Sequence, residues 1–500
     1  MLRNALIKEV SSAAAGGVDV KLVEPDRSEN GDFSTNVAFQ IAKKMENPPV
    51  GGSNDIAEEL AHKLRSAKSD LIDRADSIGG FVNIWIKDSA LIRALDEEIS
   101  FQQEKKKINL EFVSANPTGP LTMANGRGGF YGDALANVLT KTGHNVTREY
   151  YVNDAGNQVR LLGESIEAAE GRREAKGEYY KGKYIKELVG KSAEEAVRFL
   201  FSQIKNSLEK AGIKFDVWFS EKTLRENNDP EKVLKFLEEK RLIEKKDGAI
   251  WLGDVVLVKS DGEYTYFLVD LAYHFNKFFE RKFDLAINIW GADHHGYVER
   301  MKKGIETIGV DPDRLKIIIM QLVKLISGGK EVRMSKRAGE FVTMDDLLEE
   351  ISVDVARWFF LERAPSTHMD FDLDLAKERS EKNPVYYVQY AYVRMKSILE
   401  KAGIKNYGSR IKKFENPAER ALALKILRYP ELIEDISKNY QVHRLTTYAY
   451  ELAQTFSAFY RDVKVIGSER EAELLYLVLK TKETLADALT ILGISQPEKM

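Results

Sequence analysis

The feature that most constrains this chain is a strand–helix–strand pattern over residues 108–152. The run INLEFV (108–113) predicts a strand, and apolar positions three and four residues apart from Phe130 onward predict a helix that ends at Gly143. NVTREYYV (145–152) then predicts a second strand. Two strands joined by a helical crossover pair in parallel. The sequence therefore predicts an α/β domain with a parallel sheet.

The rest of the chain divides around this domain. Residues 1–106 mix helical runs with a strand and end in a charged linker, which predicts an α+β N-terminal domain. Residues 107–372 alternate strands and helices, with a charged helical insertion at about 158–242. Residues 373–500 show long amphipathic runs and almost no strand signal, which predicts an all-α bundle. A chain of 500 residues, 43% of them hydrophobic, is long enough for these three domains.

Composition limits the chemistry. The sequence contains no Cys, which excludes disulfides, thiolate catalysis and Cys-ligated zinc or iron–sulfur sites and fits a reducing cytoplasm. The net charge is only −3 although 31% of the residues are charged, so a nucleic-acid partner would need local basic patches. No stretch approaches the ~20 apolar residues of a membrane span, and the first residues lack a signal-peptide pattern. We therefore expect a cytoplasmic protein that does not bind membranes.

The turn NPTGPLTMANGRGG (116–129) between the first strand and the helix is a candidate anion site. Its prolines fix the backbone, its glycines allow close approach of a ligand, and Thr122, Asn125 and Arg127 supply donors at the helix N-terminus. A triphosphate suits such a site, although the P-loop and dinucleotide-fold motifs are both missing. The simpler interpretation is a tight turn followed by a capped helix. The local chemistry gives the two interpretations equal weight.

The stretch GGKEVRMSKRAGEF (328–341) is a candidate phosphate-binding loop. It places four cations within eight residues behind a Gly-Gly pair: Lys330, Arg333, Lys336 and Arg337. A mobile cationic loop can close over a polyphosphate and neutralise a departing pyrophosphate. The simpler interpretation, a solvated charged loop, is favoured when this stretch is taken alone.

IWGADHHG (289–296) follows an expected strand and is a candidate nucleoside site. Ligands of parallel sheets bind beyond the carboxyl ends of the strands, so Asp293 is placed to accept hydrogen bonds from ribose hydroxyls. His294 and His295 are neighbours in sequence and point in different directions on a regular element. With no further ligand at suitable spacing, we do not expect a metal site there.

Tyr266 and Asp270 are candidates for binding a cation. They are four residues apart and share one face if the segment is helical. A carboxylate beside an aromatic ring can hold a guanidinium by paired hydrogen bonds and stacking. The simpler interpretation is a surface helix with a core tyrosine, and the segment alone favours it.

Several long stretches are together more specific than any of these motifs alone. They are SANPTGPL (114–121), YYVNDAGNQ (150–158), DLAYH (270–274), WGADHHGYV (290–298), VRMSKRAGEFVTMDDLL (332–348), NPVYYVQYAYVR (383–394) and ILGISQPEKM (491–500). On these stretches the chain resembles the bacterial-type arginyl-tRNA synthetases, a family of class I aminoacyl-tRNA synthetases. The resemblance spans nearly the whole chain.

The resemblance implies a Rossmann-like catalytic domain that holds ATP between two signatures. The first, a His-x-Gly-His box, falls at 122–125 and has Thr122 and Asn125 in place of both histidines. These side chains can donate to phosphate oxygens but carry no charge. The second, a Lys-Met-Ser-Lys loop, is present with Arg333 in place of its first lysine and with Lys336 as its last. The implied catalytic residues are these four.

The resemblance also implies the binding residues. ATP as co-substrate, with Mg²⁺ and no protein-held metal, would contact Gly126, Gly291, Asp293, Met334 and Ser335. Arginine would contact Asn116, Asn153, Asp154, Gln158, Glu221, Tyr266 and Asp270, with Glu221 the weaker of the two guanidinium carboxylates.

The implied reaction is ATP-dependent activation of arginine to arginyl-adenylate and transfer to the 2′-OH of tRNA(Arg), by an enzyme expected to be a monomer. The N-terminal domain is expected to contact the tRNA, and the bundle to bind its anticodon. Two alternatives stay open: a non-catalytic paralogue that binds tRNA or arginine, and a different ATP-dependent ligase on the same fold.

For the bundle, a phosphate-binding patch is expected from Lys396, Lys401, Lys405, Arg410, Lys412 and Lys413. Most of the aromatic residues Tyr448, Tyr450, Phe456, Phe459 and Tyr460 are expected in the bundle core, because they recur at helical spacing.

Overall fold

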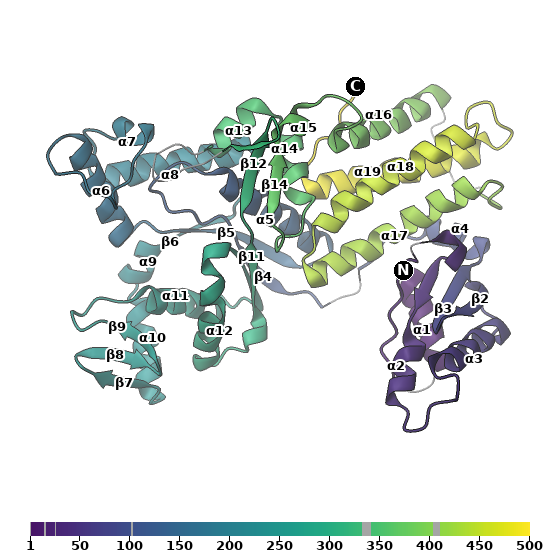
Figure 1. Cartoon of the computed structure of the whole chain (residues 1–500), viewed down its shortest axis with the longest axis horizontal. Coiled ribbons are helices and arrows are strands. Elements are labelled where there is room, and N and C mark those ends of the chain that lie inside the picture. The colour runs from purple at the N-terminus through teal and green to yellow at the C-terminus, as the bar shows by residue number, and fades with distance from the viewer. Residues whose placement is uncertain (1, 15–16, 26, 102–103, 333–341, 404–410) are drawn as a thin grey trace.

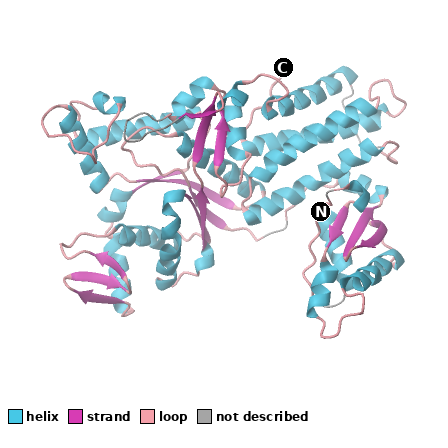
Figure 2. Ribbon diagram, in the orientation of Figure 1, coloured by secondary structure: helices cyan, strands magenta, loops and turns pink. Residues whose placement is uncertain are grey.

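The structure, a computed structural model, describes residues 2–14, 17–25, 27–101, 104–332, 342–403 and 411–500. A central body built on a sheet carries a helical bundle on one side, and the N-terminal domain lies beneath that bundle against α17 (Figure 1). Strands gather in the central body, in a small outlying sheet and in the N-terminal domain, whereas the bundle is helical (Figure 2). The predicted fold class is confirmed.

The N-terminal domain packs three helices and a short fourth around a three-stranded antiparallel sheet of order β1-β3-β2. The strand expected there is β3; β2 and β1 carry too few apolar residues to be recognised by alternation. The elements are α1 (Leu2–Ala14), η1 (Ser28–Asn30), β1 (Phe33–Thr35), α2 (Val37–Lys44), α3 (Ser53–Ser66), β2 (Ile72–Ile78), β3 (Phe81–Ile86) and α4 (Asp88–Asp96).

The central body is built on a five-stranded parallel sheet of order β11-β10-β4-β5-β6. The strands are β4 (Lys107–Glu111), β5 (Asn145–Val152), β6 (Val217–Ser220), β10 (Leu285–Gly291) and β11 (Leu315–Met320). Helix α5 (Met123–Lys141) is the crossover from β4 to β5, so the predicted strand–helix–strand unit is confirmed. Because all five strands are parallel, their carboxyl ends share one edge, where a ligand is expected.

The segment expected to be a helical insertion, 158–242, contains a strand of the main sheet. Three helices come first, but β6 then pairs with the end of β5 and forms the sheet edge. The sequence VWFS of β6 is too short to show a strand period. The helices are α6 (Asn157–Ala169), α7 (Lys183–Glu187) and α8 (Ala193–Lys210) before β6, and α9 (Glu221–Glu226) and α10 (Asp229–Glu239) after it.

Two further three-stranded sheets lie outside the main one. The strands β7 (Ile243–Lys246), β8 (Ala249–Leu252) and β9 (Val255–Val258) form an antiparallel sheet, and β12 (Val323–Ser327) pairs with β13 (Lys330–Val332) and β14 (Met369–Asp372). The remaining elements of the body are α11 (Tyr266–Phe275), which continues into the π-helical turn η2 (Asn276–Glu280), then η3 (Ala292–Tyr297), α12 (Val298–Thr307), η4 (Pro312–Arg314), α13 (Met344–Glu350), α14 (Val353–Leu361) and α15 (Leu373–Lys377).

The C-terminal bundle consists of α16 (Pro384–Ala402), α17 (Pro417–Asn439), α18 (His443–Asp462) and α19 (Glu471–Leu492). As predicted, most of its aromatic side chains are core: Tyr448, Phe456 and Phe459 are buried, Tyr450 is half-buried and Tyr460 is 40% exposed. Of the expected basic patch, Lys405 and Arg410 lie outside the described residues, and Lys396 pairs with glutamates.

Within the described ranges, no helix combines the length and the apolar character that a membrane span requires.

Two glycines of helix α5 lie directly against side chains of neighbouring segments. A Cβ added to Gly132 would lie 2.3 Å from the ring of Phe112, and one added to Gly129 would lie 2.7 Å from Ile213. These glycines are therefore needed for packing. At Gly128 an added Cβ would meet no atom within 4 Å.

We predict that Gly132→Ala destabilises the protein by about 1–3 kcal/mol, because the new methyl overpacks the contact with Phe112. The matched control is Gly128→Ala, which we expect to be neutral or stabilising by up to about 1 kcal/mol, since alanine favours a helix interior. Urea unfolding curves of the two variants test this. Equal effects at both positions would contradict the packing role.

Candidate active site at the carboxyl ends of the strands

The turn that follows β4 has a backbone conformation that residues other than glycine rarely adopt. Val113 has φ 67° and Ser114 has φ 41°, in the left-handed region that disfavours β-branched residues. The Ser114 hydroxyl donates to Oε1 of Glu111 at 3.2 Å and accepts from the backbone N–H of Tyr151 at 3.1 Å. Strand β5 therefore pins the turn. Strain of this kind persists where surrounding contacts enforce it and is concentrated at functional sites.

Thr122 and Asn125 form the N-terminal cap of α5. Thr122 Oγ1 accepts from the backbone N–H of Asn125 at 3.4 Å, and Asn125 Oδ1 accepts from the backbone N–H of Thr122 at 2.9 Å. The simpler interpretation of this turn, a capped helix, is thus realised. The amide nitrogen of Asn125 donates to no side chain or backbone group of the described part of the chain, so it is available to a ligand at the helix N-terminus.

Two helix N-termini meet at this turn. The backbone N–H of Met123 donates to the carbonyl of Val342 at 3.3 Å, and that of Met344 donates to the carbonyl of Leu121 at 2.9 Å. Thr343 caps α13, so the first turns of α5 and α13 lie side by side. Helix N-termini carry partial positive charge, but Asp345 and Asp346 occupy the first turn of α13, whereas the first turn of α5 has no acidic residue. Of the two helix starts, that of α5 therefore suits an anion better.

The residue that follows the predicted basic loop lies beside this turn. Arg333, Met334, Ser335, Lys336 and Arg337 lie outside the described residues. The residue before the loop, Val332, pairs with Leu325 in the β12–β13 hairpin. The residue after it, Val342, accepts the hydrogen bond from Met123 at the start of α5. One end of the loop is therefore anchored to the helix that carries the first signature.

Arg127 does not serve the anion site, so the expectation that it donates there is wrong. Its side chain is buried, and its guanidinium donates to the carbonyls of Gln321 at 2.8 Å, Ala364 at 2.9 Å and Thr367 at 3.0 Å. Burial lowers its pKa to about 10. Arg127 instead ties α5 to the segment that leads from α14 to β14.

The two glycines expected to contact ATP, Gly126 and Gly291, have other atoms close to where a Cβ would stand. A Cβ at Gly126 would lie 3.3 Å from the sulfur of Met344, so this glycine allows α13 to approach α5. A Cβ at Gly291 would lie 2.6 Å from Oδ1 of Asp293, which folds back over it. The Asp293 side chain is exposed at the end of β10, and its neighbour His294 lies 3.6 Å away.

A buried cluster of charges lies at the carboxyl edge of the sheet. Glu111 and Glu149 face each other on β4 and β5, and Asn288 stands beside Glu111 on β10. Lys277 Nζ donates to Glu111 Oε2 at 2.7 Å and to Asn288 Oδ1 at 3.1 Å, and its side chain is fully buried. Arg281 pairs with both oxygens of Glu149. Burial lowers the pKa of Lys277, although the two glutamates oppose this shift.

Asp270 lies beside this cluster without a cation of its own. It is on α11, four residues after Tyr266, as the spacing predicts. The hydroxyl of Tyr297 donates to its Oδ2 at 2.8 Å, but no Lys or Arg of the described ranges forms an ion pair with it. Burial raises the pKa of Asp270 to about 7, and the nearby charges of Glu111 and Glu221 act in the same direction. A buried carboxylate of this kind favours the arrival of a cationic group.

A second acidic group faces the same region from α9. Glu221 is buried, and its Oε1 accepts from Arg225 at 3.0 Å. The amide of Asn153, with its nitrogen turned toward Glu221, donates to Oε2 at 3.2 Å. Burial raises the pKa of Tyr151 well above its ordinary value, and the charges of Glu221 and Asp270 add to the effect. The structure therefore brings Asn153, Glu221 and Asp270 around one tyrosine.

The other residues expected to contact arginine are either hydrogen-bonded within the protein or exposed. Asp154 accepts from Ser220 Oγ at 2.6 Å and from the backbone N–H of Lys222, which links the ends of β5 and β6. Gln158 accepts from the hydroxyl of Tyr180. Asn116 is exposed in the turn after β4, and Tyr266 is 60% exposed at the first turn of α11.

Sequence reasoning missed the charges that surround Asp270. Glu111 is the one ionisable residue within the strand INLEFV, which is unusual for a central strand and could have marked it. Lys277 and Arg281 follow Asp270 at helical spacing, seven and eleven residues on, and could have been assigned to its face. Tyr297 gave no local signal, since it meets Asp270 only through the fold.

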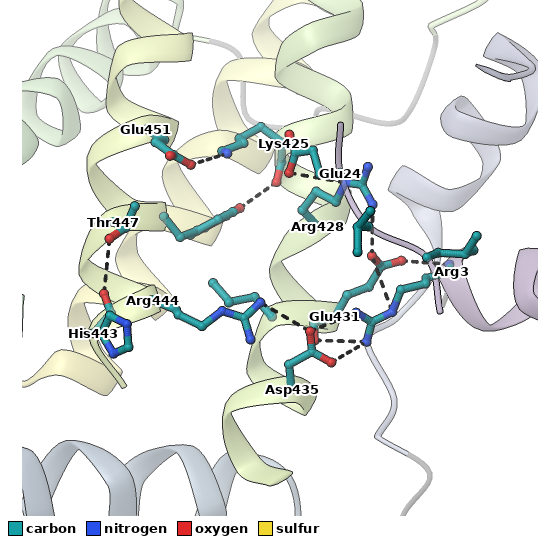
Figure 3. Close-up of a pocket in the computed structure, with 14 residues that line it drawn as sticks. Arg3, Glu24, Lys425, Arg428, Glu431, Asp435, His443, Arg444, Thr447 and Glu451 are labelled. Atoms are coloured by element: carbon teal, nitrogen blue, oxygen red, sulfur yellow. Dashed lines mark hydrogen bonds and ion pairs between the residues drawn. The ribbon is translucent and has the colours of Figure 1, made fainter. Parts of the chain in front are cut away.

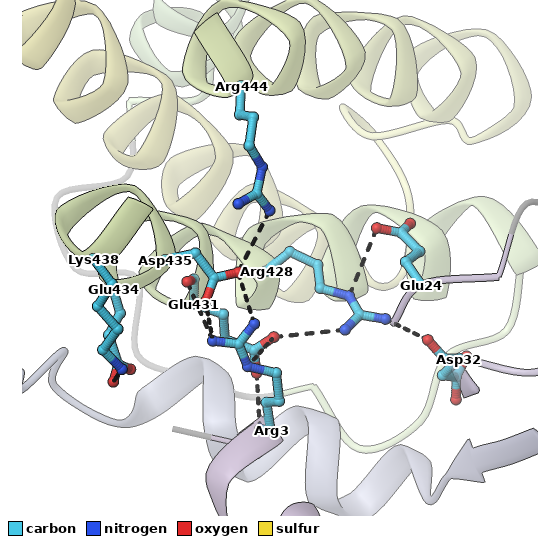
Figure 4. Close-up of polar contacts among 9 residues, drawn as sticks. All are labelled: Arg3, Glu24, Asp32, Arg428, Glu431, Glu434, Asp435, Lys438 and Arg444. Atoms are coloured by element: carbon cyan, nitrogen blue, oxygen red, sulfur yellow. Dashed lines mark hydrogen bonds and ion pairs between the residues drawn. The ribbon is translucent and has the colours of Figure 1, made fainter. Parts of the chain in front are cut away.

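A cavity of about 410 Å³ lies far from this edge, between the N-terminal domain and the bundle (Figure 3). Its charges are already paired (Figure 4). Arg3 donates to both oxygens of Asp435, which also lies 3.4 Å from Arg444, and Arg428 lies 3.5 Å from Glu431. The ion pair of Arg3 with Asp435 attaches the N-terminal domain to α17, so we assign the cavity a structural role.

The chain matches three family models over nearly its whole length. Residues 1–86 match the arginyl tRNA synthetase N terminal domain, residues 89–179 and 175–377 match the catalytic domain of tRNA synthetases class I (R), and residues 388–500 match the DALR anticodon binding domain.

Curated relatives cover the same length. The arginine–tRNA ligase of Carboxydothermus hydrogenoformans is 40% identical over 100% of this chain and 97% of its own, and that of Thermotoga maritima is 38% identical over 100% of both. Among solved structures, Thermus thermophilus arginyl-tRNA synthetase superposes with a TM-score of 0.82 over 100% of both chains at 22% identity, which supports the fold.

We predict that Lys277→Met destabilises the protein by about 3–5 kcal/mol, because it leaves the buried Glu111 without its cation. The control is Lys259→Met, which removes an exposed ion pair with Glu263 and should cause no measurable change. The shift of the urea midpoint measures both. The account of the cluster would fail if Lys277→Met were as mild as the control.

Proposed function

The chain belongs to the class I arginyl-tRNA synthetases, and we propose that it is an ATP-dependent arginine–tRNA ligase whose site lies at the carboxyl ends of β4, β5 and β10. The observation that carries this proposal is Asp270, a half-buried carboxylate that lacks a cation among the described residues. The charge of Glu111, at the end of β4, acts on it, and the strained turn that follows β4 leads to the N-terminus of α5. A cationic substrate and an anionic one can therefore meet there.

The arginine side chain would enter beside Asp270. Its planar guanidinium can make paired hydrogen bonds to this carboxylate, with Glu221 as a second acidic partner and the ring of Tyr266 as a stacking surface. A lysine ammonium cannot reproduce paired bonds, and it would leave a buried acceptor unsatisfied. Asn116 would contact the amino acid backbone, and Asn153, Asp154 and Gln158 would complete the pocket.

The ATP phosphates would lie at the N-terminus of α5. The partial positive charge of the helix start and the amide nitrogen of Asn125 would attract them without a histidine charge, and Thr122 would hold Asn125 in place. Gly126 would lie under the phosphates, and Gly291 and Asp293 would contact the adenosine. The loop that holds Arg333, Met334, Ser335 and Lys336 would supply positive charge to the phosphates.

The chemistry needs positioning rather than a protein nucleophile. A carboxylate oxygen of arginine attacks the α-phosphorus of ATP, and the bond to the bridging oxygen breaks so that pyrophosphate leaves with the electron pair. The 2′-hydroxyl of the terminal tRNA ribose then attacks the arginyl carbonyl and displaces AMP. The basic loop stabilises the charge that develops on the phosphates, and fixed geometry lowers the barrier.

Mg²⁺ would arrive with ATP. Among the residues that the structure describes, no three histidine or acidic side chains converge as metal ligands, so we assign no step to a protein-held ion. The monomeric state, the cytoplasmic location and the domain boundaries at 106/107 and 372/373 stay predictions.

Arginine-dependent exchange between ATP and pyrophosphate, measured with tRNA(Arg) present, tests the proposed function. We expect exchange with arginine, and at least a hundredfold less with lysine or with citrulline, the neutral analogue of arginine, because neither satisfies the Asp270 site. Absence of exchange while tRNA still binds would favour the non-catalytic paralogue. Equal exchange with another amino acid would refute the substrate assignment.

We predict that Asp270→Asn weakens arginine binding by about 2–5 kcal/mol and leaves ATP binding nearly unchanged, because it removes one partner of a buried charge pair. The control is Glu263→Gln, an exposed carboxylate just before α11. Calorimetric titration of both variants with arginine measures the effect. Similar affinities in the two variants would contradict the role of Asp270.

In the absence of arginine, we expect the Asp270→Asn variant to be stabilised against unfolding at high pH. The pKa of Asp270 is raised from its ordinary 3.8 to about 7 in the folded state, so its stabilising contribution is complete below pH 3.8 and is lost as pH rises toward 7. Asp270→Asn should therefore be more stable than the wild type at pH 8 but not at pH 4. A stability difference that does not change with pH would contradict the raised pKa.

A further inference from the structure

Helix α5 carries the first signature at one end and contacts the bundle along its length. Asp133, Asn137 and Lys141 are four residues apart and share one face of the helix. Asn137 Nδ2 donates to the carbonyl of Ile491 at 2.9 Å, and Lys141 Nζ lies 2.8 Å from Asp487. Both partners are on α19. This face of α5 is therefore bonded to α19 of the C-terminal bundle.

The third member of this face, Asp133, reaches the bundle through Arg357 of α14. The buried guanidinium of Arg357 donates to Asp133 Oδ2 at 2.8 Å and to the carbonyl of Leu492, the last residue of α19, at 3.2 Å. Its other nitrogen donates to the carbonyls of Ala211 at 3.2 Å and Gly212 at 2.8 Å, where α8 ends. The side chain of Arg357 thus connects its own helix, α14, to α5, α8 and α19.

The chemistry of this joint requires arginine. The carboxyl ends of α8 and α19 present unpaired carbonyls and partial negative charge, which a cation stabilises. Only a planar group with donors on several sides can bond four acceptors at once. The turn after α19 is shaped around it: Gly493 has φ 71°, and a Cβ there would lie 2.3 Å from the guanidinium.

The joint also reaches the arginine pocket through β5. Arg148 of β5 donates to Asn137 Oδ1 at 2.7 Å and lies 3.9 Å from Asp133. Three residues later, the backbone N–H of Tyr151 donates to Ser114 in the turn after β4 at 3.1 Å, and its ring contacts that of Tyr273 on α11, the helix that carries Asp270. A shift of α19 would therefore be felt by both elements that frame the active site, α5 and β5.

We propose that Arg357 is a positioning residue for aminoacylation: it sets the signature end of α5 according to the position of α19, so that a tRNA held correctly by the bundle raises turnover. This inference rests on the proposed function. It concerns a residue that touches neither substrate, and it predicts an effect on kcat rather than on tRNA affinity.

The test compares wild type and Arg357→Lys in aminoacylation at saturating tRNA(Arg), with the natural anticodon and with a substituted one. In the wild type, the substituted anticodon should lower kcat by about tenfold or more, the size of a typical coupling between sites. Arg357→Lys should lower kcat with the natural tRNA by a similar factor, should show little further loss with the substituted one, and should keep its KM for tRNA within about twofold.

Three results would overturn the inference: equal fold losses with both tRNAs in the variant, a wild-type kcat that ignores the anticodon, or an effect confined to KM. If Arg357→Lys fails to fold, Asn137→Ala gives the same test through the parallel contact with Ile491. Tyr476→Phe is the control, because it removes the hydrogen bonds of α19 to Leu95 and Asp96, which do not involve α5. It should keep the wild-type response to the anticodon.

A failure of the proposed function would give a different result from a failure of the role of Arg357. In that case the wild type itself would not aminoacylate tRNA(Arg), whatever the anticodon. A wild type that is active but shows one of the three overturning results would refute the role of Arg357 alone.

Discussion

The rest of the site depends on how negative charge is distributed at the carboxyl edge of the parallel sheet. Four carboxylates gather there, and the fold supplies a buried cation to Glu111, a half-buried one to Glu149 and an exposed one to Glu221. Among the described residues, Asp270 accepts a hydrogen bond from a tyrosine hydroxyl and forms no ion pair. A desolvated carboxylate without a cationic partner is costly, so Asp270 favours a cation. A guanidinium is the group that we propose to bind there, through paired hydrogen bonds.

The residues at the start of α5 that we propose to bind the nucleotide are neutral, in contrast to the carboxylates around Asp270. Thr122 and Asn125 are neutral and together cap α5. In the site that we propose, the attraction for phosphate comes from the N-terminus of α5 rather than from a histidine charge. The position of α5 is then important, since the helix end itself is the proposed binding group.

The sequence alone predicts what depends on local pattern. The β4–α5–β5 unit, the helical bundle and the shared face of Tyr266 and Asp270 follow from periodicity and spacing. Arg127 was assigned wrongly because a cation at a helix start suits a phosphate equally well whether or not the fold buries it. Residues such as Lys277 and Tyr297 acquire their roles by meeting Glu111 and Asp270 across the fold, and the four-residue strand β6 is too short to carry a pattern.

The most direct test of the account is the number of protons released when arginine binds, obtained from calorimetry in buffers of different ionisation enthalpy. With a pKa of about 7, Asp270 is mostly protonated at pH 6 in the free protein and must ionise to bind the guanidinium. We predict that most of a proton is released per arginine at pH 6 and much less at pH 8, and that Asp270→Asn lacks this difference between the two pH values. Binding of arginine without proton release at pH 6 would contradict the claim that a neutralised, buried Asp270 awaits the substrate.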